Sequence, residues 1–146
     1  MKWVVDASVA LKWIIPERDS PLAHSVRRTR TYVAPDLIVA ECVNAIWRRS
    51  RIEGYSPEQR EDALLLVRHL NVELQSTREL AVRAGLLAEA LDHPAYDCFY
   101  LALAERTDGL LLTADTKLVA KVAARPDATP VRLEPLHSLE PVQESP

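Results

Sequence analysis

The chain has 146 residues, of which 48% are hydrophobic and 27% charged, and its formal net charge is −3. This composition is typical of one globular domain that buries its core without disulfides, and the negative charge argues against binding nucleic acid by overall charge alone. No apolar run is long enough to cross a bilayer, and the N-terminal segment lacks the apolar stretch of a signal peptide. Because the two isolated cysteines, Cys42 and Cys98, also suit a reducing compartment, we expect a cytoplasmic protein that does not enter membranes.

Short apolar segments and helix signals alternate along the chain. Ser56 and Gln59 form a capping box with Pro57 at the first helical position, and Gly54 ends the preceding helix. The pattern predicts helices over residues 8–15, 20–30, 36–51, 56–69, 77–91, 96–106 and 115–124. It predicts short strands over residues 2–5, 32–34, 72–74, 110–113 and 129–133.

Strands separated by helices favour an α/β fold with three α/β/α layers, in which helices cover both faces of a central parallel sheet. We expect a single domain over residues 1–133. The remaining residues, 134–146, are rich in Pro, Glu and Ser, so we expect them to form a loose C-terminal tail.

Four acidic residues occupy apolar surroundings where an ionised carboxylate is costly unless it is paired or bound to a cation. Asp6 follows the first predicted strand and Asp115 the fourth, while Glu41 and Asp97 lie in the early turns of predicted helices. Ligands of parallel sheets bind beyond the carboxyl ends of the strands, and all four acids can reach that edge. Carboxylate oxygens are the ligands that Mg²⁺ prefers, so the pattern predicts a magnesium site. Taken singly, Asp6, Asp97 and Asp115 could equally be helix caps.

Three neutral polar residues accompany these acids and are candidates for supporting roles. Ser8 and Thr113 lie two residues from Asp6 and Asp115, where a hydroxyl can bond a carboxylate or take part in an ordinary turn. Asn44 lies one helical turn after Glu41, on the same face.

The basic residues cluster locally despite the negative net charge. Arg48, Arg49 and Arg51, together with Lys117, are candidates for contacts with nucleic-acid phosphates, although they could equally be solvated cations at helix ends. The four histidines are scattered and do not form a metal-binding pair, so we assign them no role.

The chain resembles PIN domains of the VapC type, the toxin ribonucleases of bacterial and archaeal toxin–antitoxin pairs. The resemblance covers residues 2–133 and rests on four segments that occur in family order. They are Val5-Asp6-Ala7-Ser8, Pro35-Asp36-Leu37 with Glu41 and Asn44-Ala45, Tyr96-Asp97-Cys98-Phe99-Tyr100-Leu101-Ala102-Leu103-Ala104, and Leu112-Thr113-Ala114-Asp115. Cys98 departs mildly from the small residue that usually follows the third acid.

The resemblance implies a PIN-like fold with Asp6, Glu41, Asp97 and Asp115 as the catalytic and metal-binding quartet, and with Mg²⁺ or Mn²⁺ as cofactor. It also implies an RNA substrate, cleavage that leaves a 5′-phosphate, a cognate antitoxin and a homodimer. Such a metal would activate water and stabilise the anionic transition state of phosphodiester hydrolysis. The alternative that stays open is a PIN-fold RNA-binding or interaction module without strong nuclease activity.

Overall fold

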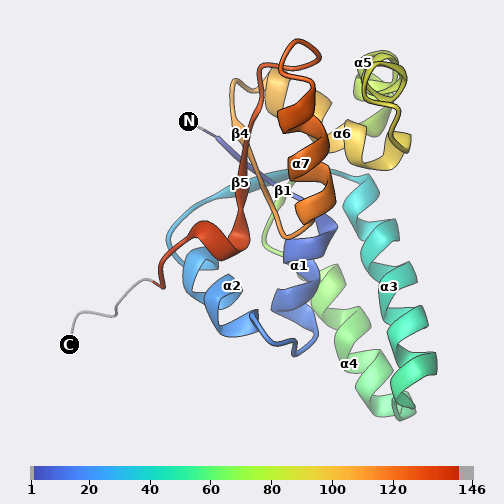
Figure 1. Cartoon of the computed structure of the whole chain (residues 1–146). Helices are drawn as coiled ribbons and strands as arrows, with labels where there is room; N and C mark the ends of the chain where they lie inside the picture. Colours follow the sequence, from blue (N-terminus) through green and yellow to red (C-terminus); the bar gives the residue numbers. More distant parts are fainter. Residues whose placement is uncertain (1, 142–146) are drawn as a thin grey trace.

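Five short strands form the centre of the computed structural model, which describes residues 2–141 (Figure 1). They form one parallel sheet in the order β3-β2-β1-β4-β5. The strands are β1 (Trp3–Val5), β2 (Tyr32–Pro35), β3 (Glu73–Gln75), β4 (Leu110–Thr113) and β5 (Arg132–Pro135). The helices are α1 (Ala7–Ile14), α2 (Ser20–Arg27), α3 (Leu37–Glu53), α4 (Pro57–Arg68), α5 (Thr77–Leu91), α6 (Ala95–Arg106), α7 (Thr116–Ala124) and the short 3₁₀ helix η1 (Leu136–Ser138).

The order of the strands places a topological switch point between β1 and β4. From β1 the chain proceeds outward through β2 to β3, and it then returns to the other side of β1 to form β4 and β5. In Figure 1, α1 to α4 lie together in the lower part of the molecule and α5 and α6 in the upper part, so helices flank the sheet as expected. Ligands of such sheets bind at the carboxyl ends of the strands that meet at the switch point. Asp6 and Asp115 follow those two strands.

The central strands are buried and the edge strands are not. Almost every residue of β1, β2 and β4 is buried, whereas the edge strand β3 exposes Glu73 and Leu74. This agrees with the apolar runs from which those central strands were predicted, because a parallel strand covered on both faces needs apolar residues throughout. The capping box of Ser56 and Gln59 is also present at the start of α4.

The last strand begins later than the sequence indicates. The predicted range was 129–133, but Thr129 is held outside the sheet because its hydroxyl donates a 2.7 Å hydrogen bond to Glu105. The strand runs instead from Arg132 to Pro135, and Leu136 of η1 is 1% exposed and belongs to the core. The folded part therefore continues past residue 133, where the sequence places the start of the tail. Residues 142–146 of the predicted tail lie outside the described residues. None of the described helices has the length and apolar character needed to span a bilayer.

Candidate active site

Asp6 connects the carboxyl ends of β1 and β4. It is the N-cap residue of α1, and its side chain accepts a 3.3 Å hydrogen bond from the Val9 amide. The hydroxyl of Ser8 donates to one carboxylate oxygen and the hydroxyl of Thr113, from β4, donates to the other. Asp6 is therefore both a helix cap, as the simpler interpretation expects, and the centre of a buried polar cluster with the two predicted hydroxyls.

The environment of Asp6 opposes its ionisation. The pKa of Asp6 is raised from 3.8 to about 6, mainly because the side chain is buried and to a smaller extent because of the nearby charge of Asp97. The hydrogen bonds from Ser8, Thr113 and Val9 lower the pKa and offset part of this rise. At neutral pH the carboxylate is ionised at an energetic cost that a bound cation would remove.

Glu41 is bound by a tyrosine from a different helix. The hydroxyl of Tyr100, on α6, donates a 2.6 Å hydrogen bond to Glu41, on α3. Burial raises the pKa of Glu41 and the charge of Asp97 adds to the effect, while the bond from Tyr100 lowers it. Burial and the neighbouring Glu41 likewise raise the pKa of Tyr100, so this hydroxyl stays protonated and remains a donor. Tyr100 was not predicted as a site residue.

Asp97 lies in the first turn of α6 and has a histidine partner. His93 Nε2 lies 2.6 Å from Asp97 Oδ2, and His93 comes from the turn between α5 and α6. His93 was assigned no role, because no two histidines form a metal-binding pair. The spacing of four residues between His93 and Asp97 is the signal that indicates this contact.

Asp115 differs from the other three acids in that its side chain is bonded to two backbone amides of its own helix. It is the N-cap of α7 and accepts hydrogen bonds from the backbone amides of Lys117 and Leu118, at 3.0 and 3.1 Å. Its own amide donates to the Thr113 hydroxyl at 3.0 Å. The structure thus brings Asp115 to the same sheet edge as Asp6 through Thr113, with its side chain directed to its own helix.

The four acids offer a donor set that fits a hard divalent cation, because all of the donors are carboxylate oxygens. Asp97 lies within electrostatic range of both Asp6 and Glu41, as the direction of their pKa shifts indicates. Within residues 2–141, however, no three acidic, histidine or cysteine side chains converge closely enough to hold a metal ion in their present positions. A metal would therefore have to draw the carboxylates together.

The arginines that were predicted to contact nucleic acid lie farther out, toward the end of α3. Arg48 and Arg51 on α3 are exposed, and Arg51 lies 5.3 Å from the ring centre of Trp47. Arg49 is engaged in ion pairs with Glu17 at 2.9 Å and with Glu53 at 3.3 Å. These arginines follow Glu41 by seven to ten residues, or roughly 10–15 Å along the helix. Lys117 on α7, the fourth candidate for a phosphate contact, is exposed. Asn44 on α3, which was predicted to support the acids, is exposed as well.

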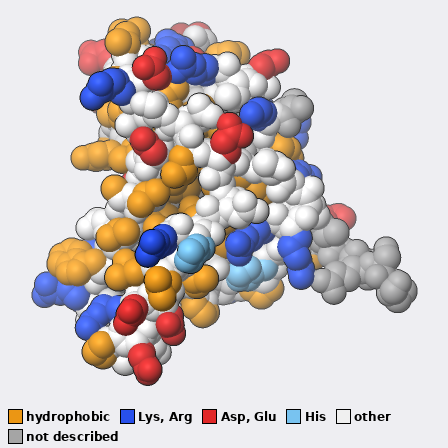
Figure 2. Space-filling view, turned by 180° about the vertical axis from the view of Figure 1, so that it is seen from behind, with side chains coloured by type: hydrophobic (Ala, Val, Ile, Leu, Met, Phe, Trp, Pro, Cys, Tyr) orange, Lys and Arg blue, Asp and Glu red, His pale blue; other side chains and the backbone are white. Residues whose placement is uncertain are grey.

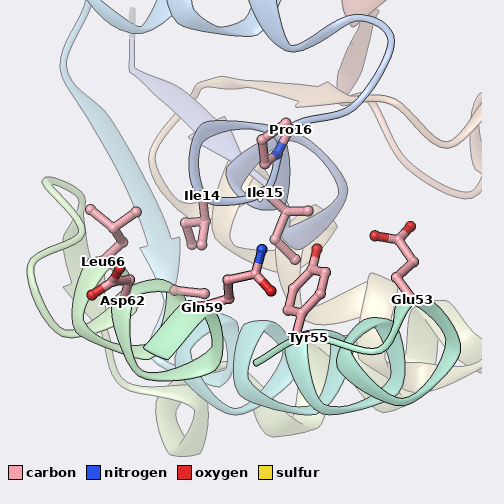
Figure 3. Close-up of a pocket in the computed structure, with 9 residues that line it drawn as sticks. Ile14, Ile15, Pro16, Glu53, Tyr55, Gln59, Asp62 and Leu66 are labelled. Atoms are coloured by element: carbon pink, nitrogen blue, oxygen red, sulfur yellow. The ribbon is translucent and has the colours of Figure 1, made fainter. Parts of the chain in front are cut away.

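A hollow of about 370 Å³ lies away from the acids, at the opposite end of α1 (Figure 3). Ile14, Ile15 and Pro16 form one wall, and Tyr55 and Leu66 contribute from the α3–α4 turn and α4. Asp6 precedes α1 whereas this hollow follows it, so the two sites are separated by the length of the helix.

Comparisons with known proteins identify the family. The model of the PIN domain matches residues 3–124. Over 127 residues the chain is 32% identical to Ribonuclease VapC3 of Pyrobaculum aerophilum, an alignment that covers 85% of this chain and 97% of that protein.

Three solved structures share the fold. PAE2754 from Pyrobaculum aerophilum has a TM-score of 0.64 and 21% identity, over 94% of this chain and 85% of that chain. VapBC2 from Rickettsia felis, bound to a DNA fragment from its promoter, has a TM-score of 0.60 and 14% identity, over 92% and 98% of the two chains. VapBC-1 from nontypeable Haemophilus influenzae has a TM-score of 0.61 and 16% identity, over 94% and 99%. The match of the family model, together with the identity to a VapC ribonuclease, shows that the chain belongs to the PIN-domain family.

Proposed function

We propose that this PIN-domain protein is a divalent-metal-dependent endoribonuclease that acts in the cytoplasm as the toxin of a toxin–antitoxin pair. Its relative Ribonuclease VapC3, 32% identical, supports the reaction class. The observation that carries the proposal is the position of Asp97, which lies within electrostatic range of both Asp6 and Glu41 at the sheet edge where parallel folds bind ligands. The buried thiols of Cys42 and Cys98, which form no disulfide, support a reducing compartment.

In this proposal Asp6, Glu41, Asp97 and Asp115 hold Mg²⁺, or alternatively Mn²⁺. When bound, such an ion activates water and offsets the charge of the phosphorane-like transition state. The surrounding residues hold the carboxylates in place. Ser8 and Thr113 orient Asp6, Tyr100 orients Glu41 and His93 orients Asp97. Exposed Asn44, one turn after Glu41, is in position to donate a hydrogen bond to a substrate oxygen.

The decisive variant is Asp97→Asn, assayed for RNA cleavage with Mg²⁺ and again with excess chelator. Loss of a metal-binding carboxylate should reduce the cleavage rate by more than about 100-fold. This exceeds the 10–100-fold effect that is typical when only a hydrogen-bond partner of a metal ligand is removed. The matched control is Asp62→Asn, at an exposed position of α4, which should cleave like the unchanged protein. Equal cleavage by Asp97→Asn, or full cleavage in chelator, would refute the mechanism. RNA binding without cleavage by the unchanged protein would favour the alternative of a binding module.

We also propose that a cognate antitoxin binds the acidic site. The VapBC names of two structural relatives support such a partner, and the neighbouring charges of Asp6, Glu41 and Asp97 support this place. A basic side chain of the antitoxin would pair with the carboxylates, and an apolar segment would bind exposed apolar surface. Trp47, which is 53% exposed, supports this role, whereas Trp13 is buried in the core and is excluded from it. Mg²⁺ and Asp97→Asn should each weaken binding of the protein encoded by the neighbouring gene in a titration. An affinity that responds to neither would place the antitoxin elsewhere.

A homodimer is the remaining part of the proposal, and exposed apolar residues support it. Val82 and Leu86 lie four residues apart on α5 and are 80% and 58% exposed, and Val43 is exposed on α3. In Figure 2, hydrophobic side chains gather on the left side of the view, where α3 lies. Sedimentation of a Val82→Asp, Leu86→Asp variant should give a monomer, whereas Leu74→Asp, at an exposed position of the edge strand β3, should not change the mass. A dimer that survives the first variant would exclude the α5 surface.

A further inference from the structure

An open hollow of about 520 Å³, with two lysines at its rim, adjoins the acidic site. It is lined by His93, Lys117, Ala120 and Lys121, and so lies between the α5–α6 turn and the outer face of α7. Two of its lining residues are bonded to the acids themselves. His93 Nε2 lies 2.6 Å from Asp97, and the backbone amide of Lys117 donates to Asp115. The hollow is therefore next to Asp97 and Asp115.

The walls of the hollow are fixed by the fold. Asp92 ends α5 in a left-handed conformation with φ of 49°, which turns the chain so that His93 faces the first turn of α6. The ammonium group of Lys121 donates to the Asp92 carbonyl and thereby ties α7 to this turn.

The two lysines form an arrangement that favours an anion. Lys117 and Lys121 are four residues apart on α7 and share a face, where like charges repel and destabilise an isolated helix. Ala120 beside them leaves the surface open, and none of the four lining residues is acidic. Because the Lys121 ammonium bonds a neutral carbonyl, its positive charge is not compensated by that contact.

We propose that this hollow binds an internal phosphate of the RNA strand, next to the phosphate that the acidic site would cleave. The inference rests on the proposed ribonuclease function and adds to it a substrate subsite and the direction in which the strand leaves the site, along α7. An RNA strand that enters a cluster of carboxylates is repelled by them, and cations placed directly beyond the acids offset that repulsion. The arginines of α3 are farther from Glu41, and Arg49 is already paired.

The first test is the double variant Lys117→Gln, Lys121→Gln in the full chain, in which each glutamine keeps a donor but loses the charge. We expect the KM for RNA to rise roughly tenfold at low salt, while kcat changes by less than about twofold. The slope of the logarithm of the RNA-binding constant against the logarithm of the salt concentration should become shallower by about 0.7 for each lysine. The matched control is Arg125→Gln at the far end of the same helix, where the guanidinium pairs with Asp127. Its KM and salt dependence should not change.

The second test uses the unchanged protein and single-stranded RNAs in which one phosphate after another is replaced by a neutral methylphosphonate. One position near the cleavage site should weaken binding to the unchanged protein but not to the double variant, and a terminal 5′-phosphate should make no difference. Cleavage with the same KM and salt dependence in both proteins would overturn the subsite and leave the ribonuclease intact. Lysine-dependent binding without any cleavage would keep the phosphate site and overturn the ribonuclease.

Discussion

Substitution of Asp6 by Asn should make the metal-free protein more stable at neutral pH. The buried carboxyl has a pKa near 6 in the folded protein and 3.8 in the reference state. Since the folded state holds this proton more tightly than the unfolded chain, the contribution to stability is fully present below pH 3.8 and is lost as the pH rises through 6. At about 1.36 kcal/mol for each pKa unit, the ionised Asp6 costs about 3 kcal/mol at pH 7.5. Asparagine cannot ionise, and it is also a good helix N-cap.

The assay is urea unfolding of both proteins at pH 4 and at pH 7.5, in chelator. Replacing the carboxylate also removes a hydrogen-bond acceptor, but this affects the free energy of unfolding at both pH values. The difference in that free energy between pH 4 and pH 7.5 therefore reports the titration of Asp6. The free energy of unfolding of the unchanged protein should fall by about 2 to 3 kcal/mol more than that of Asp6→Asn between pH 4 and 7.5. Asp62→Asn, at an exposed position, should follow the unchanged protein. Parallel pH profiles for Asp6→Asn and the unchanged protein would show that burial does not penalise this carboxylate.

Three further predictions concern the groups around Asp6 and the core. Tyr100→Phe removes the 2.6 Å hydrogen bond to Glu41 and should lower the free energy of unfolding by about 1–3 kcal/mol at pH 7.5 but by less at pH 4. The same loss at both pH values would contradict a hydrogen bond to an ionised carboxylate. Lys12→Met breaks 2.7 Å ion pairs with Glu17 and Asp19 and should lower the same quantity by about 1–3 kcal/mol in urea. Lys2→Met, which breaks the exposed pair with Glu73, should change it by less than about 1 kcal/mol. Millimolar Mg²⁺ should raise the thermal midpoint of the unchanged protein more than that of Asp6→Asn, and equal shifts would place the metal away from Asp6.

The sequence was sufficient for the type and order of the elements because their signals are local. The capping box at Ser56, the left-handed Gly54 after α3 and the apolar strands each depend on residues close together in the chain. The end of the sheet was harder to predict. Thr129 is drawn out of β5 by Glu105, a partner 24 residues earlier, and no local pattern indicates that bond.

The same distinction separates the predicted site residues from those that were missed. Ser8 lies two residues from Asp6, and the spacing of Thr113 from Asp115 indicates a polar cluster at a strand end. The bond between Tyr100 and Glu41 joins residues 59 positions apart, and it forms only because α3 and α6 both reach the edge of the sheet. The contact of His93 with Asp97 could have been predicted from the local sequence, since the two residues are about one helical turn apart. Pro94 between them was interpreted only as a helix break.

The positions of these partners show how the fold stabilises a cluster of acids at the edge of the sheet. Each of the three coupled acids has a donor that reduces its cost, namely the hydroxyls of Ser8 and Thr113 for Asp6, Tyr100 for Glu41 and His93 for Asp97. Each of these bonds occupies a carboxylate oxygen that a metal would also use. A metal must therefore compete with the donors for the same oxygens, and so must a basic side chain of an antitoxin. On the proposed function, metal and antitoxin should each stabilise the domain alone, and their stabilisation should not add when both are present.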